Sequence, residues 1–303
     1  MNEQEILKKV KAITALAAEI EALLSPEQKT AVKKVEPELD LNDFESLKKA
    51  LLSDKWPEAV NPNIICNPNN EADKLDRGRG IIEVLIDLNL TGKKFLDIGC
   101  GEGHCVAVSS EYKPGISVGY DIKQYPSWDA FRQRENVVLT TSFEDVKKNG
   151  PYDAIAIFDV LDHVEGEEME SLLAKAKSVL AEDGKIYLRT HPYSSRHGTH
   201  LYHHLNKAYV HLVFTPEELV KLTPEGTDMT MPNQKVLFPI RTYIRAIEAA
   251  ELHIESRREI TEKVESFFKI PKISERIMKL NSYDTFPEFQ IGIQFVDIVL
   301  RHK

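Results

Sequence analysis

Cysteine is scarce in this 303-residue chain, which contains Cys66, Cys100 and Cys105. Three is an odd number, and their spacing matches no common metal-binding motif, so we expect reduced thiols rather than a disulfide framework. Long hydrophobic runs are also missing, since none reaches the roughly 18 residues that a membrane-spanning helix requires. Residues 1–5 are polar and acidic and do not resemble a signal sequence. These absences predict a cytoplasmic protein that does not associate with a membrane.

Positive charge is in the minority, because 39 lysines and arginines stand against 48 acidic residues, a net charge of −9. Proteins that bind nucleic acid without sequence preference usually need a basic face, so we expect no general nucleic-acid binding. The chain has no repeat of fixed period and no low-complexity tract, which excludes a solenoid. With 42% hydrophobic residues it can bury a substantial core.

Three glycines, spaced two apart, follow the short apolar segment 94–98: Gly99, Gly101 and Gly103. Because they lack a Cβ atom, the backbone can turn sharply there and its amides can approach a ligand closely. Asp97 stands two residues before the first of them. The dinucleotide-binding fingerprint would have a further glycine where this chain has His104, which disfavours an NAD-dependent oxidoreductase. The pattern predicts a site for another nucleoside-containing ligand.

Four further segments follow in a recognisable order. Leu96–Gly103 is succeeded by 118–122, 139–145, 152–164 and 180–190. Over residues 75 to 220 the series resembles the motifs of class I S-adenosylmethionine-dependent methyltransferases. The resemblance implies an α/β, Rossmann-like fold: a seven-stranded, mostly parallel sheet with helices on both faces, plus an N-terminal helical extension. It also implies methyl transfer from S-adenosylmethionine, with S-adenosylhomocysteine as the product, to an acceptor that the sequence does not identify (a small molecule, RNA or protein).

The same resemblance implies which residues hold the methyl donor. Asp121 lies 22 residues after Gly99, at the tip of the next strand, where a carboxylate can accept both ribose hydroxyls. Ser142 and Phe143 correspond to the segment that frames the adenine, or else they have a structural role. For Asp97 and Asp121 the alternative is that an acid at the end of a strand caps the following loop or helix. The expected cofactor-binding set is Asp97, Gly99, Cys100, Gly101, Gly103, Asp121, Ile122, Ser142, Phe143 and Asp159.

Asp159 and His163 are the catalytic candidates, since they fall where related enzymes line the methyl side of the donor. Histidine titrates near neutral pH, so His163 could act as a general base. A structural, hydrogen-bonded acid–histidine pair is the alternative interpretation.

Histidine is concentrated after the fifth predicted strand, where six of the ten histidines lie between residues 191 and 211. Open α/β folds bind ligands at the carboxyl edge of the sheet, so this segment is expected to face the substrate. It either recognises a polar or anionic substrate or makes hydrogen bonds within a polar loop. The substrate-binding candidates are His191, Tyr193, Arg196, His197, His200 and Tyr202.

No metal is expected, although one weaker alternative exists. Asp159, Asp162, His163 and the downstream His211 loosely resemble the ligand set of the RNA 3′-terminal 2′-O-methyltransferases that use a divalent ion. Those enzymes have glutamates where this chain has the shorter aspartates.

The motif spacing favours one large α/β domain with additions. We expect a helical extension and connector at 1–70 and a methyltransferase domain at 71–303, with insertions near 191–235 and 261–288. Residues 2–24 place apolar side chains at steps of three and four, which predicts an amphipathic helix. That helix either packs on its own domain or joins subunits or a larger assembly. The competing function is therefore a methyltransferase-like fold with a structural or assembly role, with or without the cofactor.

Overall fold

The computed structural model describes residues 43–61, 70–84, 89–232 and 236–303. Its internal contacts divide the chain into two units, 1–50 and 51–303. The helix predicted at 2–24, with its role in assembly, lies outside the described residues. The first described helix, α3 (Phe44–Leu51), begins after Asp43, whose carboxylate accepts the backbone amides of Glu45 and Ser46. No helix in the described part of the chain is long and apolar enough to span a bilayer.

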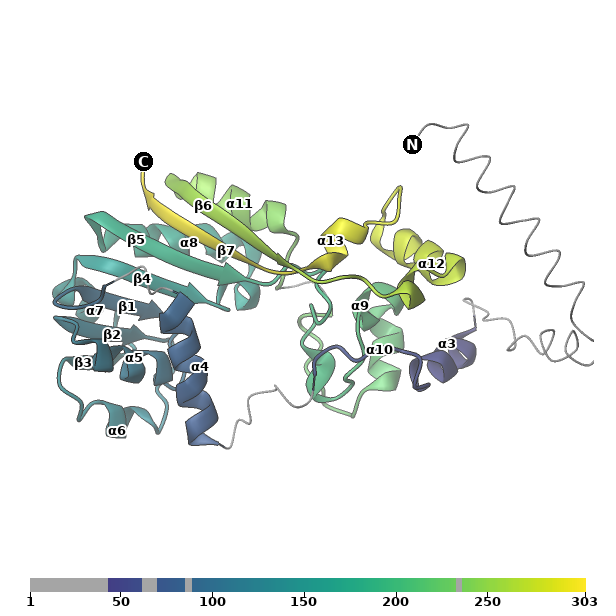
Figure 1. Cartoon of the computed structure of the whole chain (residues 1–303), viewed down its shortest axis with the longest axis horizontal. Coiled ribbons are helices and arrows are strands. Elements are labelled where there is room, and N and C mark those ends of the chain that lie inside the picture. The colour runs from purple at the N-terminus through teal and green to yellow at the C-terminus, as the bar shows by residue number, and fades with distance from the viewer. Residues whose placement is uncertain (1–42, 62–69, 85–88, 233–235) are drawn as a thin grey trace, which may run out of the picture. The chain divides into compact units, whose positions relative to one another are not determined.

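A seven-stranded sheet in the order β3-β2-β1-β4-β5-β7-β6 forms the centre of the second unit (Figure 1). The first five strands pair in parallel, and β7 runs antiparallel to both of its neighbours. The predicted fold class is confirmed. The strands are β1 (Lys94–Ile98), β2 (Ile116–Tyr120), β3 (Val137–Thr140), β4 (Tyr152–Phe158), β5 (Leu180–Thr190), β6 (Leu252–Thr261) and β7 (Ile293–His302).

Helices cover both faces of this sheet. The first face carries α4 (Glu71–Val84) and α5 (His104–Ser109), with the short α6 (Trp128–Phe131) beside α5. The second face carries α7 (Phe143–Asn149), α8 (Gly166–Ser178) and α11 (Ile240–Ala249).

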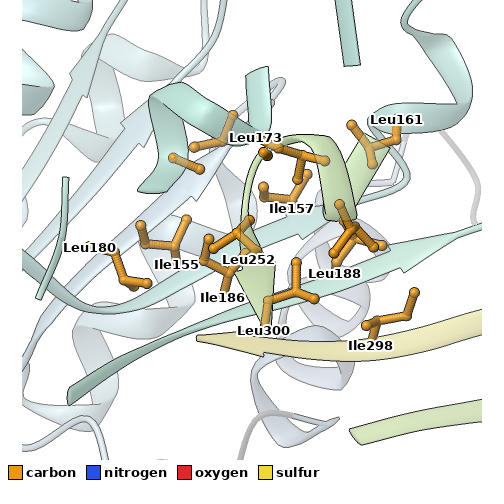
Figure 2. Packing of buried hydrophobic residues seen from close by; sticks show 14 of the residues in the cluster. Ile155, Ile157, Leu161, Leu173, Leu180, Ile186, Leu188, Leu252, Ile298 and Leu300 are labelled. Atoms are coloured by element: carbon orange, nitrogen blue, oxygen red, sulfur yellow. The ribbon is translucent and has the colours of Figure 1, made fainter. Parts of the chain in front are cut away.

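Residues 154–157 of strand β4 are all apolar, because both faces of this part of the strand are covered. Ala154 and Ala156 pack toward α4 and α5, whereas Ile155 and Ile157 join the cluster with α8 and α11. A strand that is covered on both faces has no side that can be polar. Figure 2 shows the larger cluster, in which Ile155 and Ile157 lie near side chains of β5, α8 and β7.

Two insertions and a preceding segment form a second set of helices, which we call the cap: residues 53–61, 191–222 and 262–292. Its elements are η3 (Leu201–His203), α9 (Val210–Val213), α10 (Pro216–Leu222), η4 (Ser266–Lys269), α12 (Pro271–Asn281) and α13 (Glu288–Gly292). Strand β7 begins at Ile293, directly after α13 ends at Gly292.

An ion pair and several aromatic rings join the parts of the cap. Arg276 of α12 donates to both carboxylate oxygens of Glu218 in α10, and its Nε donates to the carbonyl of Val213 at 2.6 Å. Thr215 and Glu218 form a capping box at the start of α10. Trp56 is 1% exposed and packs against three rings of the cap, those of Phe214, Phe267 and Phe268.

Candidate functional site

The glycine loop begins where β1 ends, and all three glycines have positive φ: 76° at Gly99, 51° at Gly101 and 87° at Gly103. Left-handed backbone is inexpensive for glycine and costly for other residues. The amides of Gly99 and Cys100 both donate to the carbonyl oxygen of Tyr120, at 2.8 and 3.1 Å. The loop is therefore tied to the end of β2.

Asp121 also holds this loop. Its Oδ2 accepts the amide of Gly101 at 2.8 Å, and its Oδ1 accepts the amide of Lys123 at 3.1 Å. The next residue, Ile122, has a side chain that is 90% exposed beside this carboxylate. The acid expected to hold a ribose is thus positioned by one backbone amide of the glycine loop and one of its own segment.

Asp97, near the end of β1, is 6% exposed and accepts a hydrogen bond from the thiol of Cys105. Burial raises the pKa of its carboxyl to about 7, and the nearby charge of Asp121 acts in the same direction. An ionisable group with a pKa this far from its usual range is typical of a binding or catalytic site.

Ser142 and Phe143 lie at the start of α7, beyond the end of β3. The hydroxyl of Ser142 caps the helix by accepting the amide of Asp145, and the ring of Phe143 meets that of Tyr120 edge to face at 5.6 Å. Both residues therefore have structural contacts, and their contact with an adenine stays a prediction.

The segment after β4 meets the glycine loop. A Cβ atom placed on Gly99 would lie 2.4 Å from Cγ2 of Val160, so the side chain of Val160 packs directly against the backbone of the glycine loop. Beside Val160, Asp159 has a φ of 52°, which is unusual for a residue with a side chain. Its Oδ1 lies 3.2 Å from Nε2 of His191, and its Oδ2 accepts a hydrogen bond from Arg77 at 3.0 Å.

Four histidines and a tyrosine gather around Asp159, and we call them the imidazole cluster: His163, His191, His197, His200 and Tyr202. The rings of His191 and His197 are 4.9 Å apart, those of His163 and His200 are 5.5 Å apart, and those of His197 and Tyr202 are 5.9 Å apart. Four of the six substrate-binding candidates thus lie beside the two catalytic candidates.

Charge is unevenly distributed within the cluster. Burial lowers the pKa of His191, but the hydrogen bond and the charge of Asp159 outweigh it, so the net pKa is raised. Burial lowers the pKa of His197 to about 4 and that of His200 to about 3, and the charge of His191 adds to both shifts. His197 and His200 are therefore neutral at pH 7, whereas Asp159 favours the protonated form of His191.

Asp162 lies beneath the cluster, and its side chain has no exposed surface. Burial and the charge of Asp159 raise the pKa of its carboxyl to about 6. Neither of its oxygens has a hydrogen-bond partner in the described part of the chain. Its nearest ion-pair contact is Nε2 of His163, 3.8 Å from Oδ2.

Three candidates make structural contacts elsewhere. Arg196 donates to the carbonyl oxygens of Glu58 and Ala59 and pairs with Glu265, which holds the cap segments together. The hydroxyl of Tyr193 donates to the carbonyl of His211. His211 is 4% exposed, and its Nε2 donates back to the carbonyl of Tyr193 at 2.7 Å, so the structure does not group it with Asp162 and His163.

Sequence reasoning missed Arg77 and Gln294. Arg77 reaches Asp159 from α4, and the carbonyl of Gln294 in β7 accepts Nδ1–H of His191 at 2.9 Å. Both are far from their partners in the sequence, and neither belongs to a motif, so no local signal marks them.

Comparison with protein families finds that the family described as methyltransferase domain matches residues 74–227, half of the chain. Curated relatives include the ubiquinone biosynthesis O-methyltransferases of Actinobacillus pleuropneumoniae serotype 7 (strain AP76), 29% identical over 150 residues, and Escherichia coli O7:K1 (strain IAI39 / ExPEC), 26% identical over 144 residues. Each alignment covers 46% of this chain, and 58% and 55% of the respective relative. The chain therefore spans little more than half the length of these proteins.

Solved structures with a similar fold include a SAM-dependent methyltransferase from Archaeoglobus fulgidus, with a TM-score of 0.46 and 17% identity over 75% of this chain and 93% of that one. Another is magnesium protoporphyrin IX methyltransferase from Synechocystis PCC 6803, determined with bound SAH. It has a TM-score of 0.46 and 12% identity over 80% of this chain and 91% of that one.

Proposed function

Since the chain belongs to the methyltransferase domain family, we propose that it transfers a methyl group from S-adenosylmethionine to an oxygen of a small molecule. The observation that carries the proposal is the contact between Gly99 and Val160. This contact places the glycine loop, which suits a nucleoside cofactor, against the segment after β4 that carries Asp159 and His163. Donor and acceptor sites are thus neighbours at one edge of the sheet, where open α/β folds bind ligands.

The residues of the loop fit this donor. A Cβ atom on Gly101 would meet nothing within 4 Å, so there is open space beside the loop. Asp121 supplies a carboxylate for ribose hydroxyls, the exposed Ile122 supplies an apolar surface beside it, and Asp97 supplies a buried carboxyl group. A ligand with a sugar, an aromatic base and an amino group matches that combination of partners.

When bound, the donor supplies a methyl group on a positively charged sulfur, so the acceptor needs mainly orientation, exclusion of water and loss of one proton. Asp159 is held between Arg77 and His191, and it anchors the ring of His191 at a fixed point of the cluster. His163, with a half-exposed side chain, is the cluster residue best able to take a proton from an acceptor hydroxyl.

The class of acceptor rests on the relatives and on the character of the cluster. The relatives are named for O-methylation in ubiquinone biosynthesis. The cluster combines flat imidazole and phenol rings with His191, whose protonated form Asp159 favours, and this suits an aromatic acceptor that carries hydroxyl or carboxylate groups. We therefore propose a hydroxylated aromatic small molecule.

The test compares Asp121→Ala with Asp129→Ala, an acid of α6 whose side chain is 81% exposed. Titration calorimetry with S-adenosylhomocysteine is expected to show affinity lowered roughly 10- to 100-fold in Asp121→Ala, because hydrogen bonds to charged groups contribute about 1.5–3 kcal/mol. Asp129→Ala should bind like the parent. A panel of hydroxybenzoates and diphenols with labelled S-adenosylmethionine should yield O-methylated products.

Two results would count against the proposal. Binding of NAD without binding of S-adenosylhomocysteine would exclude the donor. Labelling of RNA or protein, with no small molecule of the panel labelled, would exclude the acceptor class while leaving the donor assignment intact.

A further inference from the structure

We propose that Asp162, His163 and His200 form a binding site for a divalent transition-metal ion. One carboxylate oxygen and one imidazole nitrogen from each histidine all lie within 4.8 Å of one another. Asp162 and His163 belong to η2 (Leu161–His163), and His200 comes from the cap, just before η3. The site therefore exists only where the cap meets the end of β4.

The buried carboxylate of Asp162 is the feature that calls for a ligand. Its side chain is fully buried, and neither oxygen has a hydrogen-bond partner in the part of the chain that the structure describes. An unpaired carboxylate out of contact with water is costly, and buried charges in proteins are usually paired or bind a metal. A cation bound between Asp162 and the two histidines would give a carboxylate oxygen of Asp162 the partner that it otherwise lacks.

The neighbouring acid does not compete for this position. Oδ1 of Asp159 lies 3.2 Å from Nε2 of His191 in an ion pair, and its Oδ2 accepts a hydrogen bond from Arg77. His191 is engaged at both nitrogens, by Asp159 and by the carbonyl of Gln294. These charged contacts lie beside the proposed site and hold the segment after β4 in place. Asp162, His163 and His200 each still offer one ligand atom to a metal ion.

The ligand set indicates the class of metal. Two imidazole nitrogens and one carboxylate oxygen favour Zn²⁺, Fe²⁺, Co²⁺ or Mn²⁺ over Ca²⁺ and Mg²⁺, which prefer oxygen ligands alone. Bonds of about 2.0–2.2 Å place neighbouring ligand atoms roughly 3.4 Å apart in a tetrahedral site, so the three side chains need to converge slightly. Three protein ligands leave at least one position open for water or substrate, as in catalytic metal sites.

The role of the metal rests on the proposed function, whereas the site itself does not. An acceptor hydroxyl bound at the open position would lose its proton more readily, and that proton would pass to solvent. The oxygen would then form the new bond to the methyl carbon as the bond from that carbon to sulfur breaks. In the metal-bound protein, His163 holds the cation and is no longer the residue that accepts the proton.

Metal binding is measured on the full chain after dialysis against a chelator and without any methyl donor, by titration with Co²⁺ followed by visible absorption and with Zn²⁺ by calorimetry. We expect one ion per chain, with affinity lowered roughly 100-fold or more in His200→Ala and in Asp162→Asn, since each change removes a direct ligand. His204→Ala is the matched control, because His204 is an exposed histidine of the same segment, and it should bind like the parent.

Three results would overturn the site: no binding to the parent, binding unchanged in His200→Ala, or binding lost equally in His204→Ala. Circular dichroism of each variant establishes that it is folded, and Asp162→Asn keeps the side-chain shape, so loss of binding there does not reflect unfolding. If metal binds as expected but no acceptor is methylated, the proposed function fails while the site stands.

Discussion

At the residue scale, the three glycines of the loop serve different needs. Gly99 has no room for a side chain, because a Cβ atom would enter Val160, whereas Gly101 faces open space. Both have positive φ, so the backbone strain of a substitution is similar at the two positions. The difference between them is therefore steric. A side chain at Gly99 would disturb the packing of the loop, whereas one at Gly101 would occupy space that a ligand could use.

This difference predicts that two alanine substitutions destabilise the protein to different extents. Gly99→Ala should lower the free energy of unfolding by about 2–4 kcal/mol, from strain plus overpacking, whereas Gly101→Ala should cost only about 1–2 kcal/mol of strain. Gly101→Ala should nevertheless lower the affinity for S-adenosylhomocysteine, because its methyl group enters the space proposed for that ligand. Urea denaturation and calorimetry measure the two quantities.

The double variant Gly99→Ala/Val160→Ala serves as the control. It should recover part of the stability that Gly99→Ala loses, since the clash is removed. Equal destabilisation by Gly99→Ala and Gly101→Ala would contradict the steric explanation.

At the scale of elements, the cap depends on contacts between segments that are distant in sequence. Trp56 joins Phe214 of one insertion to Phe267 and Phe268 of the other, and its indole N–H donates to the carbonyl of Ala208 at 2.9 Å. The cap also supplies His197, His200 and Tyr202 to the imidazole cluster. Loss of its packing should therefore affect the cluster as well as stability.

Trp56→Ala is expected to lower the free energy of unfolding by about 3–5 kcal/mol, as for other buried aromatic residues. Hydrogen exchange should rise mainly in α9 and α12, while β1 and β2 keep their protection. Leu52→Ala is the matched control, because Leu52 is 64% exposed and should change stability by less than about 0.5 kcal/mol. A uniform rise in exchange across the sheet would mean that the cap and the sheet unfold as one unit.

At the scale of the whole molecule, buried ionisable groups give stability a dependence on pH in which opposite contributions compete. The pKa of His211 falls to about 3 on burial, so the folded protein binds fewer protons there than the unfolded chain below pH 6.5. The raised pKa values of Asp97 and Asp162 act in the opposite direction. The pH dependence of the protein's stability is the sum of these opposing contributions. A variant that removes one ionisable group therefore shows that group's contribution more clearly than the parent protein does.

The contribution of neutral, buried His211 to the free energy of unfolding is fully present above pH 6.5 and is lost as the pH falls toward 3. In the parent, His211 takes up nearly one proton on unfolding between pH 4 and 6, and His211→Gln should abolish that uptake. The free energy of unfolding of the variant should therefore decrease less steeply as the pH falls, by up to about 1.4 kcal/mol per pH unit. His204→Gln, at an exposed position, should leave the slope unchanged. Urea unfolding at several pH values measures this, and equal slopes for the parent and His211→Gln would show that His211 is protonated in the folded state.

The sequence by itself determined the sheet, the glycine loop and the family. Apolar strands, the glycines at 99, 101 and 103, and the acid at 121 are local patterns, and they reflect backbone geometry that acts within a few residues. The capping box that Thr215 and Glu218 form at the start of α10 is a local pattern of the same kind.

Only the tertiary structure decided which of the histidines lie together. His200 approaches Asp162 and His163, whereas His211 bonds to Tyr193; Arg77 and Gln294 complete the contacts around Asp159 and His191. Arg196 holds segments of the cap together, and its role in substrate binding stays a prediction. These pairings join distant segments through the packing of loops, and that packing follows from the shape and burial of the whole fold rather than from spacing along the chain.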